Sequence, residues 1–503
     1  MAVTQRACEH GAMDLSRREF LRAGSVLGAG LVAGGALAGC RLPLPGPGRR
    51  ARRGLLDGPA ADAPVTHIVV AMMENRSFDH WFGWLADDAT YLEAGRRRYG
   101  RQFGVDGIQD LAYPDPSGRM VPTRHLFEHP EVTNPWRGCE FQDPGHSWNS
   151  GRAQRDRGFL AAGSNNDELA LGYYEAPDLA FSAPFARRFT IFDAYHCSLL
   201  APTYPNREYL HSGQSGGNKT NYLPIAEGGF SWPTIWDRLL AAGVPCAYYY
   251  TDLPVTLLWG FRFADAVNRT IDDYYADCAA GRLPNVTFID PKFLGHDRSD
   301  NHPLGDIRAG ERFVRDTFRA FATSPHWRSG VFIVTYDEWG GFFDHVRPPV
   351  LPDDRASADD ANNFGQTGFR VPTVMASPFA RPGYVDPRVY DHTSILRFIE
   401  WRFLGAPPHG PGNDGDGWFL TTRDRNANNI GASLLRRRWS DDVGFDLDVP
   451  IGEISPPCLS EAGTAAAGPA TVHRAQVLPP THDNAFDEAS WRRYLDTLGA
   501  RTR

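Results

Sequence analysis

The amino-acid sequence predicts an α/β fold. Between residues 64 and 457, short runs of β-branched and aromatic residues alternate with segments whose apolar residues recur at helical spacing. This alternation is typical of a sheet whose strands are connected by helices. The chain has 503 residues, of which 42% are hydrophobic and 22% charged, so it has the composition of a globular protein with a sizeable core.

Six apolar runs predict strands. They are residues 65–72, 188–191, 247–251, 286–289, 331–335 and 371–376. Helices are predicted at 234–242, 307–323, 394–403 and 484–498. Residues 86–180 are rich in Gly, Pro, Asp and aromatic residues without a clean period, so we expect long loop insertions over a site there.

The first forty residues are expected to be a targeting segment. Ser16-Arg17-Arg18-Glu19-Phe20-Leu21 is a twin-arginine pattern, and a weakly hydrophobic run follows it, so we expect export by the twin-arginine route. Leu37-Ala38-Gly39-Cys40 resembles a bacterial lipobox. The mature protein is therefore expected to be either a lipoprotein anchored at the membrane or cell surface through Cys40, or a secreted protein. Residues 41–63 form a Pro, Gly and Arg linker, which could bind anionic headgroups or simply be solvated.

Charge and cysteine content narrow the possible partners. The formal net charge of −8 argues against nucleic acid as a partner, because a basic footprint is missing. Five of the seven cysteines lie after Cys40, an odd number that leaves at least one unpaired. An exported protein can form disulfides, but the pairing cannot be read from the sequence.

Polar clusters follow three of the predicted strands. Glu74-Asn75 follows the first strand, and Asp337-Glu338 follows the strand at 331–335. The third cluster is the segment 192–210 after the strand at 188–191, where Thr203 lies in Pro202-Thr203-Tyr204-Pro205-Asn206-Arg207. Ligands collect at the carboxyl ends of strands in open α/β sheets, and hard divalent cations prefer oxygen ligands. Any one cluster could instead be a turn or a helix cap. Together they predict a shared metal site formed by Glu74, Asn75, Thr203, Asp337 and Glu338.

Thr203 is placed where a helix is expected to begin, and a helix N-terminus attracts phosphate. A threonine hydroxyl becomes a nucleophile only if a metal or a base lowers its pKa, and the alternative is an N-capping threonine. Asn75 and Arg207 could donate hydrogen bonds to phosphoryl oxygens. Three histidines in polar loops are candidates for proton transfer, although a loop histidine often has no role: His146, His302 and His345.

These motifs together resemble the bacterial phosphoesterase family, which contains non-specific phospholipases C and a branch of acid phosphatases. In chain order they are ENRSFDHxFG after a strand, HSW, PTxPNRxYxxSG, a DxHP loop and YDExGGFFDHVxPP. The resemblance covers residues 64 to about 405. It implies an alkaline-phosphatase-like three-layer α/β/α sandwich, and cleavage of phosphate esters through a covalent phosphoenzyme at a metal-bound Ser or Thr.

Carried over by position, the resemblance makes Thr203 the nucleophile, and the threonine leans toward the phospholipase C branch. It places Glu74, Asn75, Asp337 and Glu338 at the metal and phosphate, and His146, His302 and His345 around the phosphoryl group. The family's usual Asp-His-Pro-Pro appears here as Asp300-Asn301-His302-Pro303-Leu304. We expect the large C-terminal domains of some members to be absent here, and residues 458–503 are predicted to be a short extension of a phosphoesterase domain at 64–457.

We therefore expect an exported, metal-dependent phospholipase C, which hydrolyses phospholipids to diacylglycerol and a phosphorylated headgroup through a phospho-threonine. It would use a divalent metal ion of undetermined identity and act at a membrane surface. One alternative is an acid phosphatase or other phosphomonoesterase on the same site. The other is a lipoprotein that binds a metal or a headgroup without turnover. Loop aromatics could bind a choline-like ammonium or pack in the core: Trp136, Trp148, Tyr173 and Tyr174.

Overall fold

The structure, a computed structural model, describes residues 53–411, 417–458 and 486–501. The twin-arginine pattern, Cys40, the linker up to residue 52 and residues 459–485 of the predicted extension lie outside these ranges. No helix within the described ranges is both long and apolar enough to cross a bilayer.

An eight-stranded mixed sheet forms the centre of the fold, in the order β12-β6-β11-β10-β1-β9-β7-β8. The strands are β1 (His67–Met73), β6 (Thr190–Phe192), β7 (Cys246–Tyr250), β8 (Asn268–Thr270), β9 (Val286–Ile289), β10 (Gly330–Tyr336), β11 (Val374–Ala376) and β12 (Tyr384–Asp386). Only β11 runs antiparallel to its neighbours, β10 and β6. All six predicted strands are present, whereas the three-residue strands β8 and β12 were not predicted.

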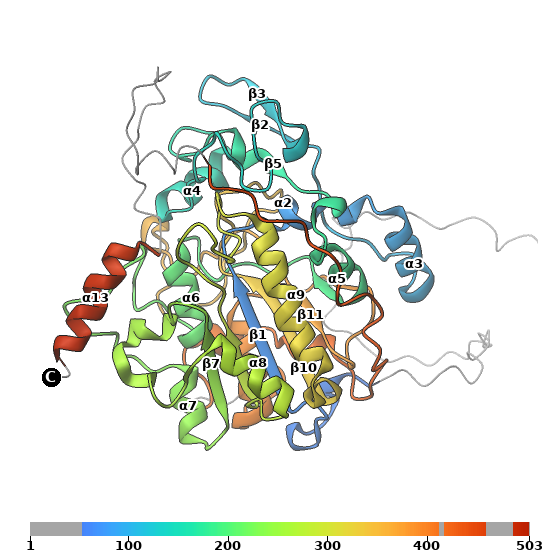
Figure 1. Cartoon of the computed structure of the whole chain (residues 1–503), viewed down its shortest axis with the longest axis vertical. Helices are drawn as coiled ribbons and strands as arrows, with labels where there is room; N and C mark the ends of the chain where they lie inside the picture. The colour runs from blue at the N-terminus through green and yellow to red at the C-terminus, as the bar shows by residue number, and fades with distance from the viewer. Residues whose placement is uncertain (1–52, 412–416, 459–485, 502–503) are drawn as a thin grey trace, which may run out of the picture. The chain divides into compact units, whose positions relative to one another are not determined.

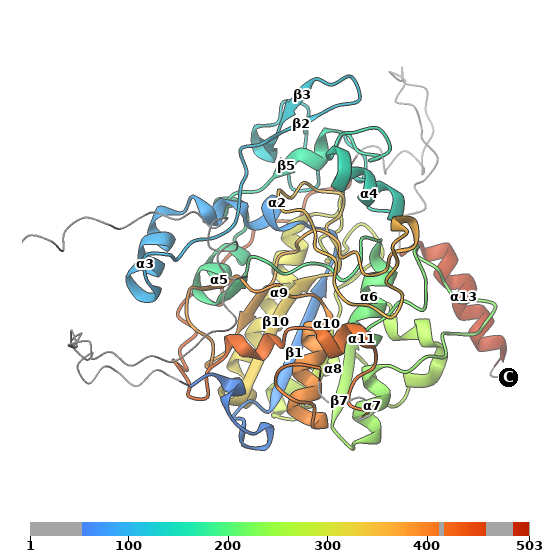
Figure 2. The same cartoon turned by 180° about the vertical axis from the view of Figure 1, so that it is seen from behind.

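Helices cover both faces of this sheet. They are α2 (Phe78–Phe82), α3 (Ala89–Tyr99), α4 (Trp148–Arg157), α5 (Ser182–Arg188), α6 (Thr203–Ser212), α7 (Ile235–Ala241), α8 (Ile271–Ala280), α9 (Ile307–Thr323), α10 (Thr393–Ile399), α11 (Thr422–Asn426) and α13 (Glu488–Arg501). Figure 1 shows α8 and α9 in front of the sheet, and Figure 2 shows α10 and α11 on the opposite face. This arrangement confirms the predicted α/β sandwich.

Helix α9 illustrates how the sequence forms these layers. Its N-cap Asp306 accepts a hydrogen bond from the backbone N–H of Arg308, which begins the helix. Phe313, Phe318 and Phe321 recur at helical spacing and are buried against the sheet. The predicted and observed bounds of this helix agree.

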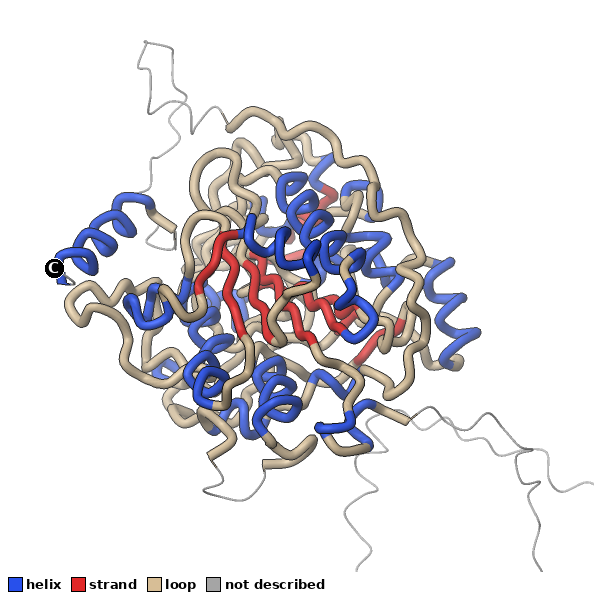
Figure 3. Tube along the Cα trace, turned by 60° about the horizontal axis from the view of Figure 1, so that its bottom comes forward, coloured by secondary structure: helices blue, strands red, loops and turns tan. Residues whose placement is uncertain are grey.

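The predicted insertion at 86–180 contains more regular structure than expected. Asp88 caps α3 and Ser147 caps α4, each with its side-chain oxygen. Two small sheets also form, from β2 (Ala112–Pro114) with β3 (Met120–Pro122), and from β4 (Arg124–His125) with β5 (Gly172–Tyr173). The description as loops alone was therefore wrong, although loops still occupy much of the surface around the sheet (Figure 3). Figure 1 shows this insertion at the end of the sheet toward which β1 points.

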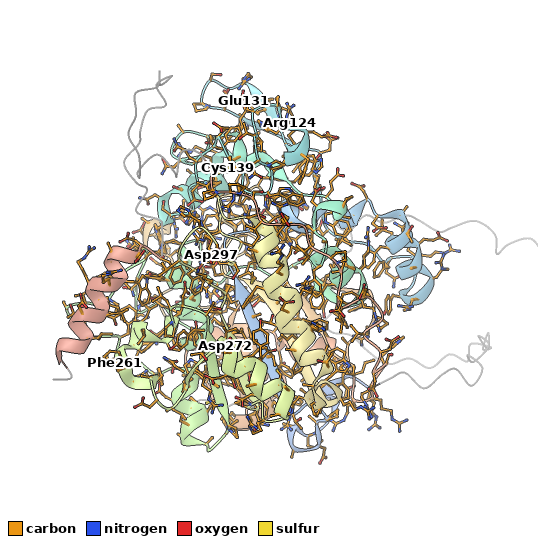
Figure 4. All side chains as sticks on the ribbon, viewed as in Figure 1. Arg124, Glu131, Cys139, Phe261, Asp272 and Asp297 are labelled. Atoms are coloured by element: carbon orange, nitrogen blue, oxygen red, sulfur yellow. A yellow bond between two sulfur atoms is a disulfide. The ribbon has the colours of Figure 1, made fainter. Side chains whose placement is uncertain are left out.

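A disulfide joins the insertion to the C-terminal part of the chain. Cys139, which lies above α9 in Figure 4, is bonded to Cys458. Cys197, Cys246 and Cys278 are buried free thiols. The expectation of at least one unpaired cysteine is thus confirmed.

Candidate active site

The carboxyl ends of β1 and β10 bring two of the predicted polar clusters together. Met73 at the end of β1 pairs with Tyr336 at the end of β10 in a parallel ladder. Glu74 and Asp337 therefore leave the sheet side by side. The backbone N–H of Asn75 donates a hydrogen bond to Asp337 Oδ1 at 3.1 Å, which ties the two strand ends.

The turn after β10 approaches the turn after β1 so closely that it requires glycine. Gly340 has a φ of 64°, and a Cβ atom there would lie 2.2 Å from the carbonyl oxygen of Asn75. Asn75 itself has a φ of 59°, a left-handed conformation that asparagine tolerates better than most residues. The two turns are thus locked against each other beside the carboxylates.

Helix α6 carries the third predicted cluster. Thr203 is its first residue, and the N-cap position is occupied by Pro202, so Thr203 is not the capping residue. The side chain of Asn206 fixes the preceding loop, donating to the carbonyl of Ala201 at 2.7 Å and accepting from the N–H of Leu199 at 2.8 Å. The Thr203 hydroxyl is buried and has no hydrogen-bond partner among the described residues.

Arg207 lies one turn after Thr203 on the same face of α6 and contacts three carboxylates. Its guanidinium nitrogens lie 3.1 Å from Glu74, 3.1 Å from Asp290 and 3.4 Å from Asp337. Burial disfavours its charge, but the three acids outweigh burial and raise its pKa. These contacts place the Thr203 end of α6 against the ends of β1, β9 and β10. The predicted role of Arg207 as a phosphate ligand stays a prediction.

A second guanidinium reaches the same cluster from the loop after β9. Arg298 Nη2 lies 3.7 Å from Glu74 Oε2, and Arg298 Nε donates to Asp300 at 2.9 Å. The carbonyl of Asp300 accepts from the N–H of Glu74 at 2.8 Å. Asp290, Arg298 and Asp300 were not among the predicted site residues. A signal existed, because Asp290 follows the strand at 286–289 just as Glu74 follows β1.

Two of the three predicted histidines face this cluster. His146 Nε2 lies 3.9 Å from Glu338 Oε1 and 3.5 Å from Asn75 Nδ2. His302 Nε2 lies 3.6 Å from Asp143 Oδ2, and the two imidazole rings are 6.0 Å apart. Burial, with Arg298 and His146, lowers the pKa of His302 well below its usual value. Ligand atoms of Asp143, His146 and His302 all lie within 4.8 Å of one another.

His345 belongs to a different network. Its Nδ1 lies 2.6 Å from Asp79 Oδ2 and its Nε2 lies 3.2 Å from Asp106 Oδ1. The buried guanidinium of Arg370 pairs with Asp79 at 3.0 Å and with Asp344 at 2.9 Å. Burial opposes the charge of His345, but hydrogen bonds to Asp106 and Asp79 raise its pKa to about 9. None of these partners is a predicted metal ligand, and the predicted catalytic role of His345 stays a prediction.

The predicted ligand set fits a divalent cation. Burial is the largest cause that raises the pKa of Glu74, Asp337 and Glu338. Within this ligand set, the buried oxygens that have no hydrogen-bond partner among the described residues are Glu74 Oε1 and Oε2, Asn75 Oδ1, Thr203 Oγ1, Asp337 Oδ2 and Glu338 Oε1. Leaving a buried oxygen without a donor costs about 1 to 3 kcal/mol, whereas a hard cation binds such oxygens directly.

Three of the four loop aromatics, Trp136, Trp148 and Tyr174, lie against the chain's own guanidiniums. Within the described ranges, the guanidinium of Arg308 lies 4.5 Å from the ring centroid of Trp136, and that of Arg152 lies 3.6 Å from Trp148. Tyr174 is buried and makes the corresponding contact with a guanidinium at 5.9 Å. These rings therefore pack against the chain's own cations, as the core-packing alternative predicts.

Comparison with known proteins decides the family. A family model described as "Phosphoesterase family" matches residues 65–404. The chain belongs to the phosphoesterase family. It is 30% identical over 436 residues to non-specific phospholipase C4 of Arabidopsis thaliana, covering 78% of this chain and 76% of that protein. Identity to phospholipase C A of Mycobacterium tuberculosis (strain H37Rv) is also 30%, over 78% of this chain and 82% of the relative. As a member of this phosphoesterase family, the chain is a phosphoric ester hydrolase.

Solved structures show a weaker likeness. A member of the alkaline phosphatase superfamily from Vibrio parahaemolyticus aligns with a TM-score of 0.33 at 8% identity, over 72% of this phosphoesterase and 73% of that chain. Human ectonucleotide pyrophosphatase/phosphodiesterase 5 aligns with a TM-score of 0.28 at 11% identity, over 43% and 87% of the two chains. Scores this low support no conclusion about the site.

Proposed function

We propose that this phosphoesterase is an exported, metal-dependent phospholipase C, which hydrolyses phospholipids to diacylglycerol and a phosphorylated headgroup with Thr203 as its nucleophile. The observation that carries the proposal is the buried Thr203 hydroxyl, which has no hydrogen-bond partner among the described residues. Thr203 is the first residue of α6, and Arg207 on the same helix contacts Glu74. The names of the plant and bacterial relatives support phospholipids as the substrates.

The residues that would hold a divalent cation are Glu74, Asn75, Thr203, Asp337 and Glu338. When bound, the cation supplies positive charge that lowers the pKa of the threonine hydroxyl and offsets the negative charge of the phosphoryl oxygens. Arg207 and Arg298 hold the Glu74 carboxylate in place from two sides. The positioning of carboxylates and nucleophile is the main contribution that a protein makes to phosphoryl transfer.

In the first half-reaction, Thr203 Oγ1 attacks phosphorus in line with the diacylglycerol oxygen; it attacks as the alkoxide, and the second half-reaction regenerates that alkoxide. A bond forms from Oγ1 to phosphorus, the bond to the leaving oxygen breaks, and that oxygen takes up a proton. The Asn75 amide donates to a phosphoryl oxygen as charge develops. His146 and His302, which face the cluster, are the proton carriers in this proposal.

In the second half-reaction, water attacks phosphorus and the Thr203 oxygen leaves. The water loses a proton to a histidine. This proton replaces the one that the histidine gave to diacylglycerol in the first half-reaction. Asp143 lies 3.6 Å from His302 Nε2 and would stabilise the protonated imidazole. Together the two half-reactions hydrolyse the phosphodiester, and the phospholipid and water are the only reactants.

The test compares Thr203→Ala and Thr203→Ser with the wild-type protein on phosphatidylcholine and on p-nitrophenyl phosphate. We expect Thr203→Ala to lose at least about 10³-fold in kcat while it still binds a divalent cation, and Thr203→Ser to keep measurable activity. Mass spectrometry after an acid quench should find the phosphate on Thr203. Equal rates for Thr203→Ala and wild type would refute the mechanism.

The same panel separates the alternatives. Faster hydrolysis of p-nitrophenyl phosphate than of any phospholipid would identify an acid phosphatase. Saturable headgroup binding by a wild-type protein that hydrolyses neither substrate would identify a non-catalytic lipoprotein.

We also propose export by the twin-arginine route, followed by anchoring through Cys40 or by release. The disulfide between Cys139 and Cys458 supports an oxidising destination. Replacement of Arg17 and Arg18 by lysine should retain the protein in the cytoplasm. Where the wild type is found in the membrane fraction, Cys40→Ala should release it. Unchanged fractionation of either variant would contradict the corresponding step.

A further inference from the structure

Helix α13 and the turn before it bring aromatic side chains from the end of the chain to the candidate active site. Phe486, Trp491 and Tyr494, which we call the C-terminal aromatic face, are 4%, 1% and 0% exposed. Figures 1 and 2 both show α13 beside the α6 end of the sheet. The sequence predicted a helix here but gave it no part in the site.

The first contact is with the residue that follows the proposed nucleophile. Trp491 Nε1 donates a hydrogen bond to the hydroxyl of Tyr204 at 2.5 Å, and the two rings pack nearly perpendicular at 6.1 Å. The backbone N–H of Tyr204 donates to Asn221 Oδ1 at 2.9 Å. Side-chain contacts on both the backbone and the ring of Tyr204 therefore hold the first turn of α6.

The second contact covers Arg207. Phe486 stacks on Phe293 with ring centroids 3.8 Å apart and an interplanar angle of 5°. The guanidinium carbon of Arg207 lies 4.8 Å from the Phe293 centroid and 5.9 Å from that of Phe486. The stacked pair excludes water from one side of the guanidinium, which strengthens its attraction to Glu74 and Asp337.

We propose that Trp491 and Phe486 are positioning residues for phosphoryl transfer, which act through Tyr204 and Arg207 to hold Thr203 against the carboxylates. This inference rests on the proposed role of Thr203 as the nucleophile. Its physical basis is that a misplacement of about 1 Å can cost about 10²-fold in rate, so side chains that fix the first turn of α6 affect kcat without touching the substrate.

The experiment isolates the hydrogen bond between Trp491 and Tyr204 in the full-length protein. Trp491→Phe keeps an aromatic ring but removes the N–H donor, and Tyr204→Phe removes the acceptor. The substrate is a short-chain phosphatidylcholine below its micellar concentration, so that membrane binding does not contribute. We expect each variant to lower kcat by about 5- to 10-fold, the equivalent of one hydrogen bond, with KM within about 2-fold.

The kcat of the double variant distinguishes a positioning role from a purely structural role. If the two residues act as one unit, Trp491→Phe/Tyr204→Phe has the same kcat as either single variant. Arg492→Ala is the matched control, because the Arg492 side chain lies on the same helix and is 72% exposed. It should leave kcat, KM and the melting temperature unchanged.

The proposal fails if Trp491→Phe has wild-type kcat, or if the two single effects multiply in the double variant. A fall in melting temperature with unchanged kcat per folded molecule also overturns it, because the helix would then only stabilise the fold. Failure of the proposed function is distinct: it appears as full activity of Thr203→Ala or as an inactive wild type, whatever Trp491 does.

Discussion

His345 tests how a charged side chain outside the carboxylate cluster contributes to the stability of the protein. The structure places it between Asp79 and Asp106 and beside the buried pairs of Arg370. Burial opposes its charge, but the two hydrogen-bonded aspartates raise its pKa from 6.5 to about 9. A pKa raised in the folded state stabilises the protein fully below the unfolded pKa, and this contribution is lost as the pH rises toward 9.

The size of the effect follows from the shift. A rise of this size corresponds to about 3 kcal/mol at about 1.4 kcal/mol per pH unit. The ring is partly exposed, with 18% of the side chain accessible, so solvent screening reduces the expected contribution to about 1 to 2 kcal/mol. His345→Asn keeps a donor for Asp79 without the titrating charge. The wild type should therefore lose about 1 to 2 kcal/mol relative to this variant between pH 6.5 and 9.

Urea unfolding of both proteins across this range measures the difference, and groups that titrate in both proteins cancel. Asp79, Asp106, Asp344 and Arg370 are the charged groups around the ring, and all four remain in the variant. We expect kcat per folded molecule to stay within about 3-fold of wild type if His345 acts only through this network. A stability difference that does not change with pH would refute the assignment. A loss of about 10²-fold or more in kcat would instead establish the catalytic role that the sequence suggested.

Three further outcomes follow from the structure. Cys139→Ser or Cys458→Ser should lower the free energy of unfolding by about 2 to 5 kcal/mol in urea, because the bond joins segments 319 residues apart; an unchanged urea midpoint would contradict this. Gly340→Ala should destabilise the protein by at least about 2 kcal/mol and reduce kcat, because its Cβ would meet the Asn75 carbonyl. Gly243→Ala, which has a similar φ but open space around it, is the control and should cost only about 1 kcal/mol. A chelator should lower the melting temperature and a divalent cation should restore it, since buried carboxylates lose their counter-charge; a melting temperature that is unaffected by both would exclude a metal in the folded protein.

Much of the sheet could be predicted because its central strands are apolar along most of their length. β1 and β10 are buried on both faces, and only such strands produce uninterrupted apolar runs. β8 could not be predicted, because Asn268–Thr270 is a partly exposed edge strand with no apolar residue. The helices of the insertion were missed for a similar reason: α4 is short, polar and begins with a tryptophan. A capping serine marks its start, but only together with a periodic pattern does a cap predict a helix.

The polar clusters at the strand ends could be predicted, but their contacts with distant residues could not. Arg207 pairs with Asp290, 83 residues away, and Trp491 bonds to Tyr204, 287 residues away. The spacing of residues in a single sequence does not indicate which side chains contact one another when they lie so far apart in the chain. Asp290 illustrates the limit, since a single acidic residue after a strand is common in turns and becomes informative only when its partner is known.

The arrangement also sharpens the reason for expecting a metal. Six carboxylates converge here: Glu74, Asp143, Asp290, Asp300, Asp337 and Glu338. Among the site residues described, Arg207 and Arg298 provide permanent positive charge. With all six acids ionised, the two guanidiniums reduce the negative charge from six to four, and one divalent cation would reduce it to about two. Arg207 and Arg298 contact the two carboxylate oxygens of Glu74 at 3.1 and 3.7 Å, but neither contact is a hydrogen bond. The arginines thus orient the carboxylates, and a divalent cation would offset part of the negative charge that they leave.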